Sequence, residues 1–195
     1  MSAREDVIAL AEAEAAEGKV YFWMGGPSAV FMNAMRKPSD ELVDLVDCGK
    51  SKDAPISCAD YPLLLARLTG HLTKQSVATI FSSYHDKFQQ SKQSGSYSVW
   101  GYVLSMSVVA ANATASPKRG DLVFLSSVGA ANDCEHVMLA CGTGEDTISF
   151  GNKHLDLTGA TRRSVVNKTT ISAMKLLYNA QQVKFCAPVW VGMFG

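Results

Sequence analysis

The sequence predicts one α+β domain, in which N-terminal helices pack on a small antiparallel sheet. Helical periodicity dominates the first half of the chain, whereas short apolar runs separated by turn residues follow residue 117. With 195 residues the chain is long enough for one well-buried core and short for two ordinary domains. Its 47% hydrophobic and 18% charged residues are typical of a globular protein. We therefore expect residues 1–195 to form a single domain.

Hydrophobic periodicity and residues that typically begin or end helices predict the elements of the first half. Gly18 is a suitable end for the first helix, and Ser39 is a suitable cap for the second. Between these helices, residues 19–24 are aromatic and β-branched and precede a Gly-Gly pair, which predicts a short buried segment ending in a tight turn. Helices are expected at residues 4–17, 39–46, 61–68 and 75–90, whereas residues 99–112 are ambiguous between helix and strand.

The helix expected at residues 61–68 is preceded by a capping sequence. Ser57 and Asp60 have the Ser-x-x-Asp spacing of a capping box, in which each side chain accepts a hydrogen bond from the backbone of the other. Cys58 would then lie in the first turn of the helix. Pro62 removes one backbone hydrogen bond unless it too lies in that turn.

The pattern changes to strands after residue 117. Strands are expected at residues 122–125, 136–141, 147–150, 165–166 and 183–191, with one helix at residues 170–179. Helices that come first and antiparallel strands that follow define the α+β class.

Charge and hydropathy exclude several classes of function. The 18 basic and 18 acidic side chains balance, which argues against electrostatic binding to nucleic acid or to an anionic membrane. No run approaches the ~20 apolar residues of a membrane helix, so membrane insertion is not expected. The N-terminus is acidic and helical and has no signal-peptide pattern. We expect synthesis in the cytoplasm and, for action elsewhere, export by a specialised secretion system or release by lysis.

Five cysteines form no C-x-x-C pair and no spacing typical of a zinc site, so no metal and no cofactor are expected. An odd number cannot all pair within one chain, which indicates a free and potentially reactive thiol. Cys141 and Cys186 lie in apolar runs and are expected to be small buried hydrophobes. The state of Cys48, disulfide-bonded or free, stays open.

Three residues have the chemistry of a thiol hydrolase. A cysteine in the first turn of a helix lies where unpaired N–H groups favour the thiolate, so Cys58 is the candidate nucleophile. His136, at the start of an apolar strand, would take the proton and later deliver it to the leaving amine. A third polar group would fix the imidazole tautomer, and Asn152 is the first candidate for this role.

Asn152 depends on the register of one hairpin. If the turn at residues 142–146 is centred on Gly144, His136 faces Asn152 directly, and both side chains lie on one face of the sheet. A slip of one residue would place Asn152 on the other face. Ser149 and His154 are the alternatives for the third role.

These residues resemble the CHAP and NlpC-type superfamily of papain-like cysteine amidohydrolases and peptidases. The resemblance lies in the cysteine at a helix start, in Gly-Asp-Leu-Val-Phe at residues 120–124, in His136-Val137, in Thr-Ile-Ser-Phe-Gly-Asn at residues 147–152, and in the aromatic-Gly-Gly segment at residues 21–26. It implies a papain-like fold and a catalytic Cys58, His136 and Asn152. It covers residues 4–26 and 57–154 in patches.

The chain departs from the family pattern at three places. The family has Asp-Cys-Ser-Gly or a similar set at the nucleophile, but here Asp47-Cys48-Gly49 leads into a charged loop. We favour Cys58 because the chemistry requires a rigid helix N-terminus. CHAP members tend to have Glu where Phe150 stands, and residues 27–56 are longer than expected, which predicts an inserted loop region.

The resemblance implies a cysteine hydrolase that cleaves amide bonds in bacterial peptidoglycan peptides. Combined with the missing signal peptide, this predicts a secreted antibacterial effector toxin of the type VI kind, active in the periplasm of the target cell. A phage lysin is the second reading. Such a toxin implies a cognate immunity protein that blocks its cleft. The alternatives are a host-directed effector that cleaves or deamidates a protein, and a non-catalytic binding module on the same fold.

Overall fold

The structure is a computed structural model that describes residues 2–25, 43–80, 116–126, 135–188 and 190–191. In chain order the elements are α1 (Ala3–Glu17), β1 (Val20–Met24), the 3-10 turn η2 (Leu45–Asp47), α3 (Asp60–Leu68), β2 (Leu122–Ser126), β3 (His136–Ala140), β4 (Asp146–Ser149), β5 (Thr161–Val165), β6 (Asn167–Thr170), α6 (Ile171–Leu177) and β7 (Gln182–Cys186). The predicted α+β class is confirmed.

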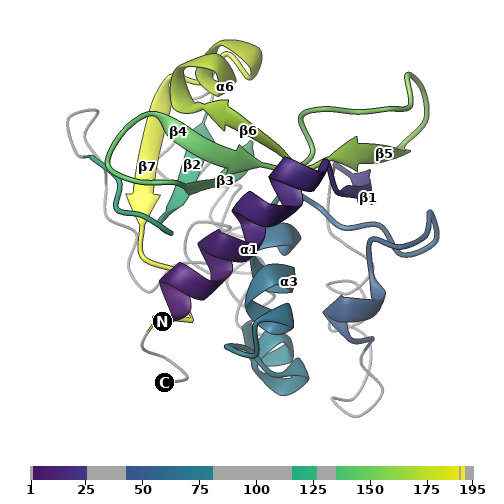
Figure 1. Cartoon of the computed structure of the whole chain (residues 1–195). Coiled ribbons are helices and arrows are strands. Elements are labelled where there is room, and N and C mark those ends of the chain that lie inside the picture. Colours follow the sequence, from purple (N-terminus) through teal and green to yellow (C-terminus); the bar gives the residue numbers. More distant parts are fainter. Residues whose placement is uncertain (1, 26–42, 81–115, 127–134, 189, 192–195) are drawn as a thin grey trace, which may run out of the picture.

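Two antiparallel sheets organise the strands. Five of them form the main sheet in the order β6-β4-β3-β2-β7, and β1 pairs with β5 in a separate two-stranded sheet (Figure 1). On the other side of β1, the backbone of Phe22 exchanges hydrogen bonds with Gly49 and Ile56. The described part of the predicted inserted loop region therefore extends the small sheet with irregular backbone.

The main sheet has an apolar layer on each face. Leu122, Phe124, Val137 and Leu139 belong to the core that contains α1 and α3, whereas the alternate residues of β2 and β3 pack with α6. This alternation follows from the two-residue period of a strand. His136 and Met138 alternate with Val137, so the His136 side chain lies on the α6 face.

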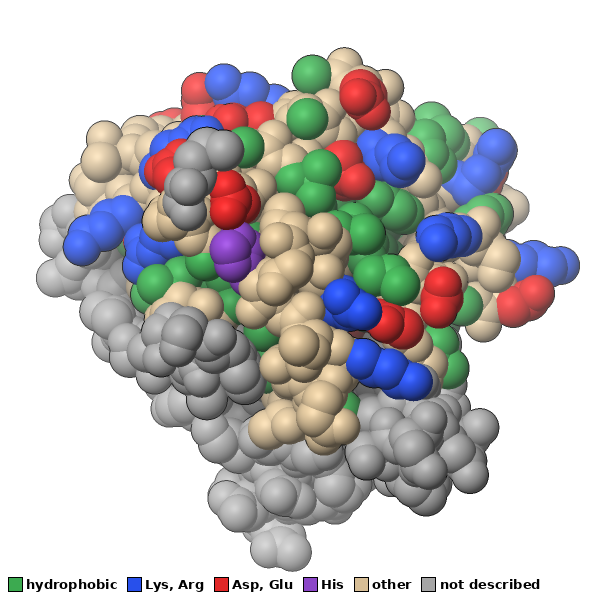
Figure 2. Space-filling model, turned by 60° about the horizontal axis from the view of Figure 1, so that its bottom comes forward, with side chains coloured by type: hydrophobic (Ala, Val, Ile, Leu, Met, Phe, Trp, Pro, Cys, Tyr) green, Lys and Arg blue, Asp and Glu red, His purple; other side chains and the backbone are tan. Residues whose placement is uncertain are grey.

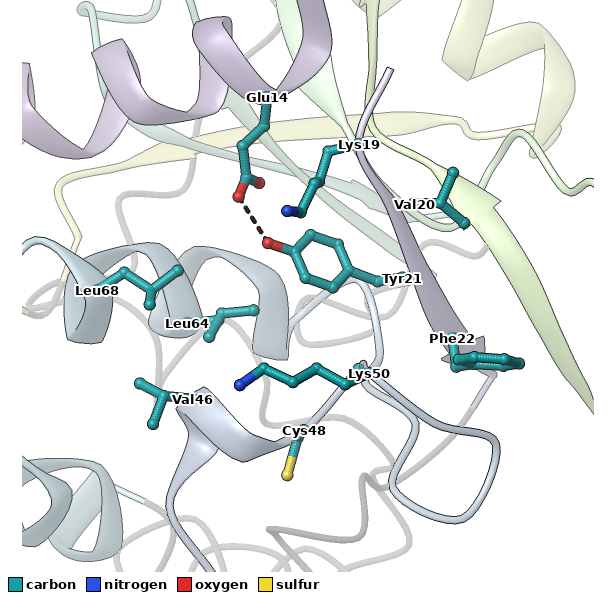
Figure 3. A pocket seen from close by; sticks show the side chains of 11 residues that line it. Glu14, Lys19, Val20, Tyr21, Phe22, Val46, Cys48, Lys50, Leu64 and Leu68 are labelled. Atoms are coloured by element: carbon teal, nitrogen blue, oxygen red, sulfur yellow. Dashed lines mark hydrogen bonds between the residues drawn. The ribbon is translucent and has the colours of Figure 1, made fainter. Parts of the chain in front are cut away.

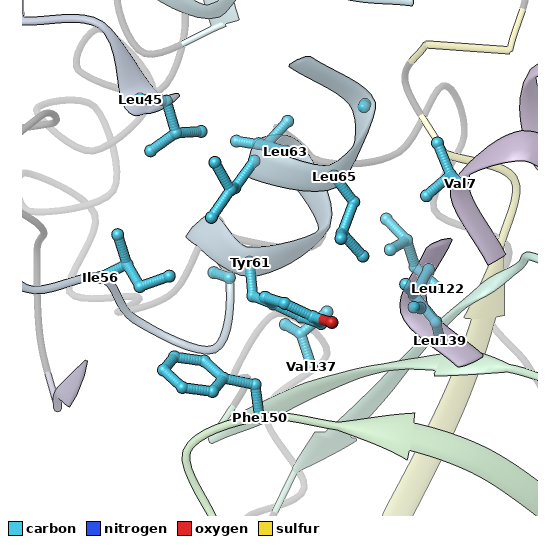
Figure 4. Close-up of a cluster of buried hydrophobic side chains, with 14 of the residues drawn as sticks. Val7, Leu45, Ile56, Tyr61, Leu63, Leu65, Leu122, Val137, Leu139 and Phe150 are labelled. Atoms are coloured by element: carbon cyan, nitrogen blue, oxygen red, sulfur yellow. The ribbon is translucent and has the colours of Figure 1, made fainter. Parts of the chain in front are cut away.

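Helix α3 lies in the middle of the larger core. Its residues from Asp60 to Ala66 are all buried, and Figure 4 shows Leu63 and Leu65 between Leu45 of η2 and the sheet. Tyr61 packs against Phe150 with 5.3 Å between ring centroids. A helix this apolar on every side needs a partner on every side, and α1, η2 and the sheet provide them.

Most predicted elements form, with different ends. α1 begins after the cap residue Ser2 and ends at Gly18, which adopts the left-handed conformation, and Thr170 caps α6. The predicted helix at 39–46 is wrong where it is described, because only a 3-10 turn forms at 45–47. There the Asp44 carboxylate accepts the Val46 N–H and pairs with Arg67.

The remaining predictions are resolved in part. Residues 74–80 are helical, whereas the rest of the helix predicted to residue 90 and all of 99–112 lie outside the described residues. The strand predicted at 165–166 is the end of the longer β5, and the one predicted at 183–191 ends at Cys186.

No helix within the described ranges is long and apolar enough to cross a membrane. On the face shown in Figure 2, basic and acidic side chains are interspersed.

The small sheet is joined to the main sheet by Trp23 and Gly151. Gly151 follows β4 and has a φ of 92°, and a Cβ placed on it would collide with the Trp23 indole nitrogen. The Trp23 ring also contacts the His154 imidazole, with 4.5 Å between centroids. Glycine is therefore required here both for its backbone conformation and for its missing side chain.

We predict that Gly151→Ala destabilises the fold by about 2–4 kcal/mol, because it combines a disfavoured φ with a steric collision. Urea unfolding measures the change. Gly142→Ala is the matched control, since a Cβ at Gly142 meets nothing within 4 Å. Equal stability of the two variants would contradict the contact with Trp23.

Candidate active site

The capping box predicted before α3 is present. The Ser57 N–H and hydroxyl both donate to one Asp60 carboxylate oxygen at 2.7 Å, and the Asp60 N–H donates to the Ser57 hydroxyl at 3.3 Å. Asp60 is completely buried. The reciprocal bonds fix the backbone on either side of Cys58, as the mechanism of a capping box requires.

Pro62 changes where the regular helix starts. The Tyr61 N–H already donates to the Ser57 carbonyl at 3.2 Å, which is a helical bond. Pro62 has no N–H to give to the Cys58 carbonyl, so α3 is regular only from Asp60 and Cys58 occupies the turn before it. The thiol is thus held in a rigid turn at the helix N-terminus, close to the predicted position.

The sulfur of Cys58 meets the beginning of β3. It accepts a hydrogen bond from the backbone N–H of Val137, and the N–H groups of Cys58 and Ala59 also face it. The Val137 N–H belongs to the peptide bond that joins Val137 to His136. Residues 78 positions apart in the sequence, Cys58 and His136, are in this way brought to one place.

Burial dominates the ionisation of the thiol. Cys58 keeps part of its surface exposed, but its sulfur is densely surrounded, and this burial raises the pKa of the thiol to about 11. The Val137 N–H and those of the turn lower the pKa, and the nearby Asp60 charge raises it. The prediction of a stabilised thiolate at Cys58 is therefore wrong for this conformation, because burial raises the pKa more than the N–H groups at the helix N-terminus lower it.

His136 is held by contacts on two sides. Its Nε2 lies 2.8 Å from the Ser149 hydroxyl, and the Tyr178 ring stacks on the imidazole with 4.6 Å between centroids and a tilt of 16°. His136 is 1% exposed, and burial lowers its pKa to about 3. Burial also raises the pKa of Tyr178, and the charges of Cys58 and Glu135 raise it further.

The predicted hairpin register is wrong by one residue. β3 and β4 pair Met138 with Ser149 and Ala140 with Thr147, because the loop between them is closed by a bond from the Cys141 N–H to the Asp146 carbonyl. This loop is one residue shorter than the predicted turn. The shift places Ser149 on the same face as His136.

Asn152 lies beyond the end of β4, in a bend. Its side-chain oxygen is buried and has no hydrogen-bond partner in the described part of the chain. His154, the other alternative, lies against Trp23, and its Nδ1 is likewise unpartnered among the described residues. Of the three candidates for the third role, Ser149 is the one that contacts His136.

The other cysteines lie elsewhere. Cys48 is buried, its sulfur is 3.7 Å from the Asp44 carbonyl, and burial raises its pKa to about 12. Cys186 is buried as expected, whereas Cys141 is only partly so. Cys134 falls outside the described residues. All four described cysteines are free thiols, and within the described ranges no group of three or more His, Cys, Asp or Glu side chains is arranged to hold a metal ion.

Comparison of the chain with protein-family models, with curated proteins and with solved structures finds no match. The resemblance to the CHAP and NlpC-type superfamily therefore rests on the motifs in the sequence. The site has to be interpreted from its own geometry.

We predict that Cys58 alkylates slowly at neutral pH. Because its pKa is near 11, the thiolate fraction and the rate with iodoacetamide should rise about tenfold per pH unit up to pH 10. Peptide mass spectrometry reports the rate at this residue, with free cysteine as the reference. A plateau below pH 9 would show that the thiolate is stabilised instead.

His136 should make stability depend on pH. Its folded pKa is near 3, below the unfolded value of about 6.5, so its contribution is complete above pH 6.5 and is lost as the pH falls toward 3. Unfolding free energies at pH 6.5 and 4.5 should differ by roughly 2 kcal/mol more in the wild type than in His136→Gln. Parallel pH profiles would contradict a buried neutral imidazole.

Proposed function

We propose that the protein is a cysteine hydrolase that cleaves amide bonds, with Cys58 as nucleophile and His136 as general base. The observation that carries the proposal is the hydrogen bond from the Val137 N–H to the Cys58 sulfur, one residue along β3 from an imidazole held by Ser149. A nucleophile, a base and a group that orients the base, converging from three elements, form the arrangement that covalent acyl transfer requires.

Ser149 determines which ring nitrogen acts. When the Nε2–H of His136 donates to the Ser149 hydroxyl, Nδ1 carries the lone pair and takes the thiol proton. Ser149 is thus a positioning residue. Tyr178 has a related part, because its stacked ring restricts the imidazole to one plane.

The reaction starts from a neutral thiol and a neutral imidazole. The sulfur forms a bond to the substrate carbonyl carbon as its proton passes to Nδ1, because neither charged form is stable alone in this buried site. The imidazolium gives that proton to the amine as the C–N bond breaks, leaving a thioester. Water, deprotonated by His136, then displaces the sulfur, and the thiol regains its proton from the imidazolium.

The papain-like arrangement and the substrate class belong to the same proposal. A cysteine at the start of a helix packed on an antiparallel sheet that carries the histidine supports a papain-like fold. The family resemblance points to peptide amides of bacterial peptidoglycan as the substrate. We propose delivery as an antibacterial effector with a cognate immunity protein. A host protein as target is the alternative that keeps the chemistry.

One observation favours the second candidate, a binding module without catalysis. Burial keeps the Cys58 thiol and the His136 imidazole neutral, whereas a preformed thiolate and imidazolium are typical of many cysteine hydrolases. Turnover by the purified protein decides between the two.

We predict that purified protein releases peptides from peptidoglycan and that Cys58→Ala lowers the rate by about 10³-fold or more, since it removes the nucleophile. Mass spectrometry of muropeptides measures this and identifies the bond. Cys141→Ala, a thiol at the far end of β3, should retain activity. Unchanged lysis by Cys58→Ala would refute the nucleophile, whereas cleavage of host proteins alone would refute the substrate.

A further inference from the structure

A cavity of about 460 Å³ lies apart from Cys58, His136 and Ser149. It is open to solvent on one side and is bordered by the C-terminal end of α1, by β1, by the loop after η2 and by the second half of α3 (Figure 3). Its lining residues are Glu14, Lys19, Val20, Tyr21, Phe22, Val46, Cys48, Gly49, Lys50, Leu64 and Leu68. Its volume is in the range of small-molecule sites, about 300–1,000 Å³.

One side of the cavity is apolar. Leu64 and Leu68, one helical turn apart on α3, face it together with Val46. Leu68 is 48% exposed, although Leu64, one turn earlier on α3, is buried. An apolar group of a ligand would cover this surface and remove it from water.

Two lysines point into the same space. In Figure 3 the Lys50 side chain extends toward Leu64 and Val46, and the Lys19 ammonium lies beside the Tyr21 ring on the Glu14 side, whereas Val20 and Phe22 turn away. The Lys19 ammonium lies 5.9 Å from the Tyr21 ring centroid. Neither ammonium is within ion-pair distance of a carboxylate in the described part of the chain. Both charges are available to a ligand.

The third charged group of the cavity is committed to the protein. Glu14 is 7% exposed, and its two carboxylate oxygens accept the Tyr21 hydroxyl at 2.6 Å and the Tyr61 hydroxyl at 2.9 Å. With Lys19 and Lys50 it gives the lining a net charge of +1. A ligand with one negative charge would neutralise this lining, whereas a dianion would leave the occupied cavity with a net charge of −1.

We propose that this cavity binds a monocarboxylate with an apolar body, whose carboxylate pairs with Lys19 and Lys50 and whose body lies on Leu64, Leu68 and Val46. Lysine ammonium groups suit this role as compact charges on flexible stems. An acyl chain and a peptide ending in an apolar residue both have this chemistry. The site is independent of the proposed hydrolase.

Calorimetric titration of the wild type with decanoate and with N-acetyl-leucine, each against its neutral amide, tests the proposal. At least one acid should bind at least about tenfold more tightly than its amide, and weaken with added salt. Binding of decanoate alone identifies an acyl ligand, and binding of N-acetyl-leucine alone identifies a peptide terminus. No binding of either acid below about 1 mM, or equal binding of acid and amide, would overturn it.

Variants of the two lysines locate the site. Lys19→Met with Lys50→Met keeps the apolar stems and should weaken binding about tenfold or more, whereas Lys52→Met, an exposed lysine of the same loop outside the lining, should not. Unchanged binding by the double variant refutes the site. If that variant does not fold, the acid and amide comparison on the wild type decides. The readout is binding, so its failure leaves the proposed hydrolase unaffected.

Discussion

The burial of α3 is the constraint on which both sites depend. Tyr61, Leu63 and Leu65 are surrounded by protein, and the Tyr61 hydroxyl donates to Glu14 of α1. A helix surrounded in this way cannot rotate or slide without opening a cavity, which close-packed interiors resist. The turn before it therefore holds Cys58 against β3, and the second half of α3 forms one wall of the cavity with the two lysines.

The fold was predictable where its signals are local. The first helix, the Ser57-x-x-Asp60 cap and the strands after residue 117 each follow from propensity, capping and periodicity within one segment. The pairing of β1 with β5 was not predicted, because it joins residues more than 130 positions apart. The helix expected at 39–46 failed in its described part because the Asp44 side chain makes a tertiary pair with Arg67.

The candidate site likewise contains residues that local sequence patterns predict and residues that depend on tertiary structure. Cys58 and His136 were singled out because each stands at the start of an element, where short sequence patterns are informative. The third role moved from Asn152 to the alternative Ser149 because a hairpin loop one residue shorter than expected reverses which side chains share a face. Tyr178 carries no local signal, since nothing in the sequence near it indicates that α6 ends over the imidazole.

The candidate site needs elements from both faces of the main sheet, and these elements are synthesised at different times. α3 packs on one face, and the imidazole lies on the other beneath the end of α6. During synthesis the segment with Cys58 leaves the ribosome well before β3, β4 and Tyr178 do. Until they arrive the thiol has the reactivity of an ordinary exposed cysteine. Protection of the Cys58 thiol therefore appears late in synthesis, so the reactivity of this one side chain reports whether β3, β4 and α6 have packed.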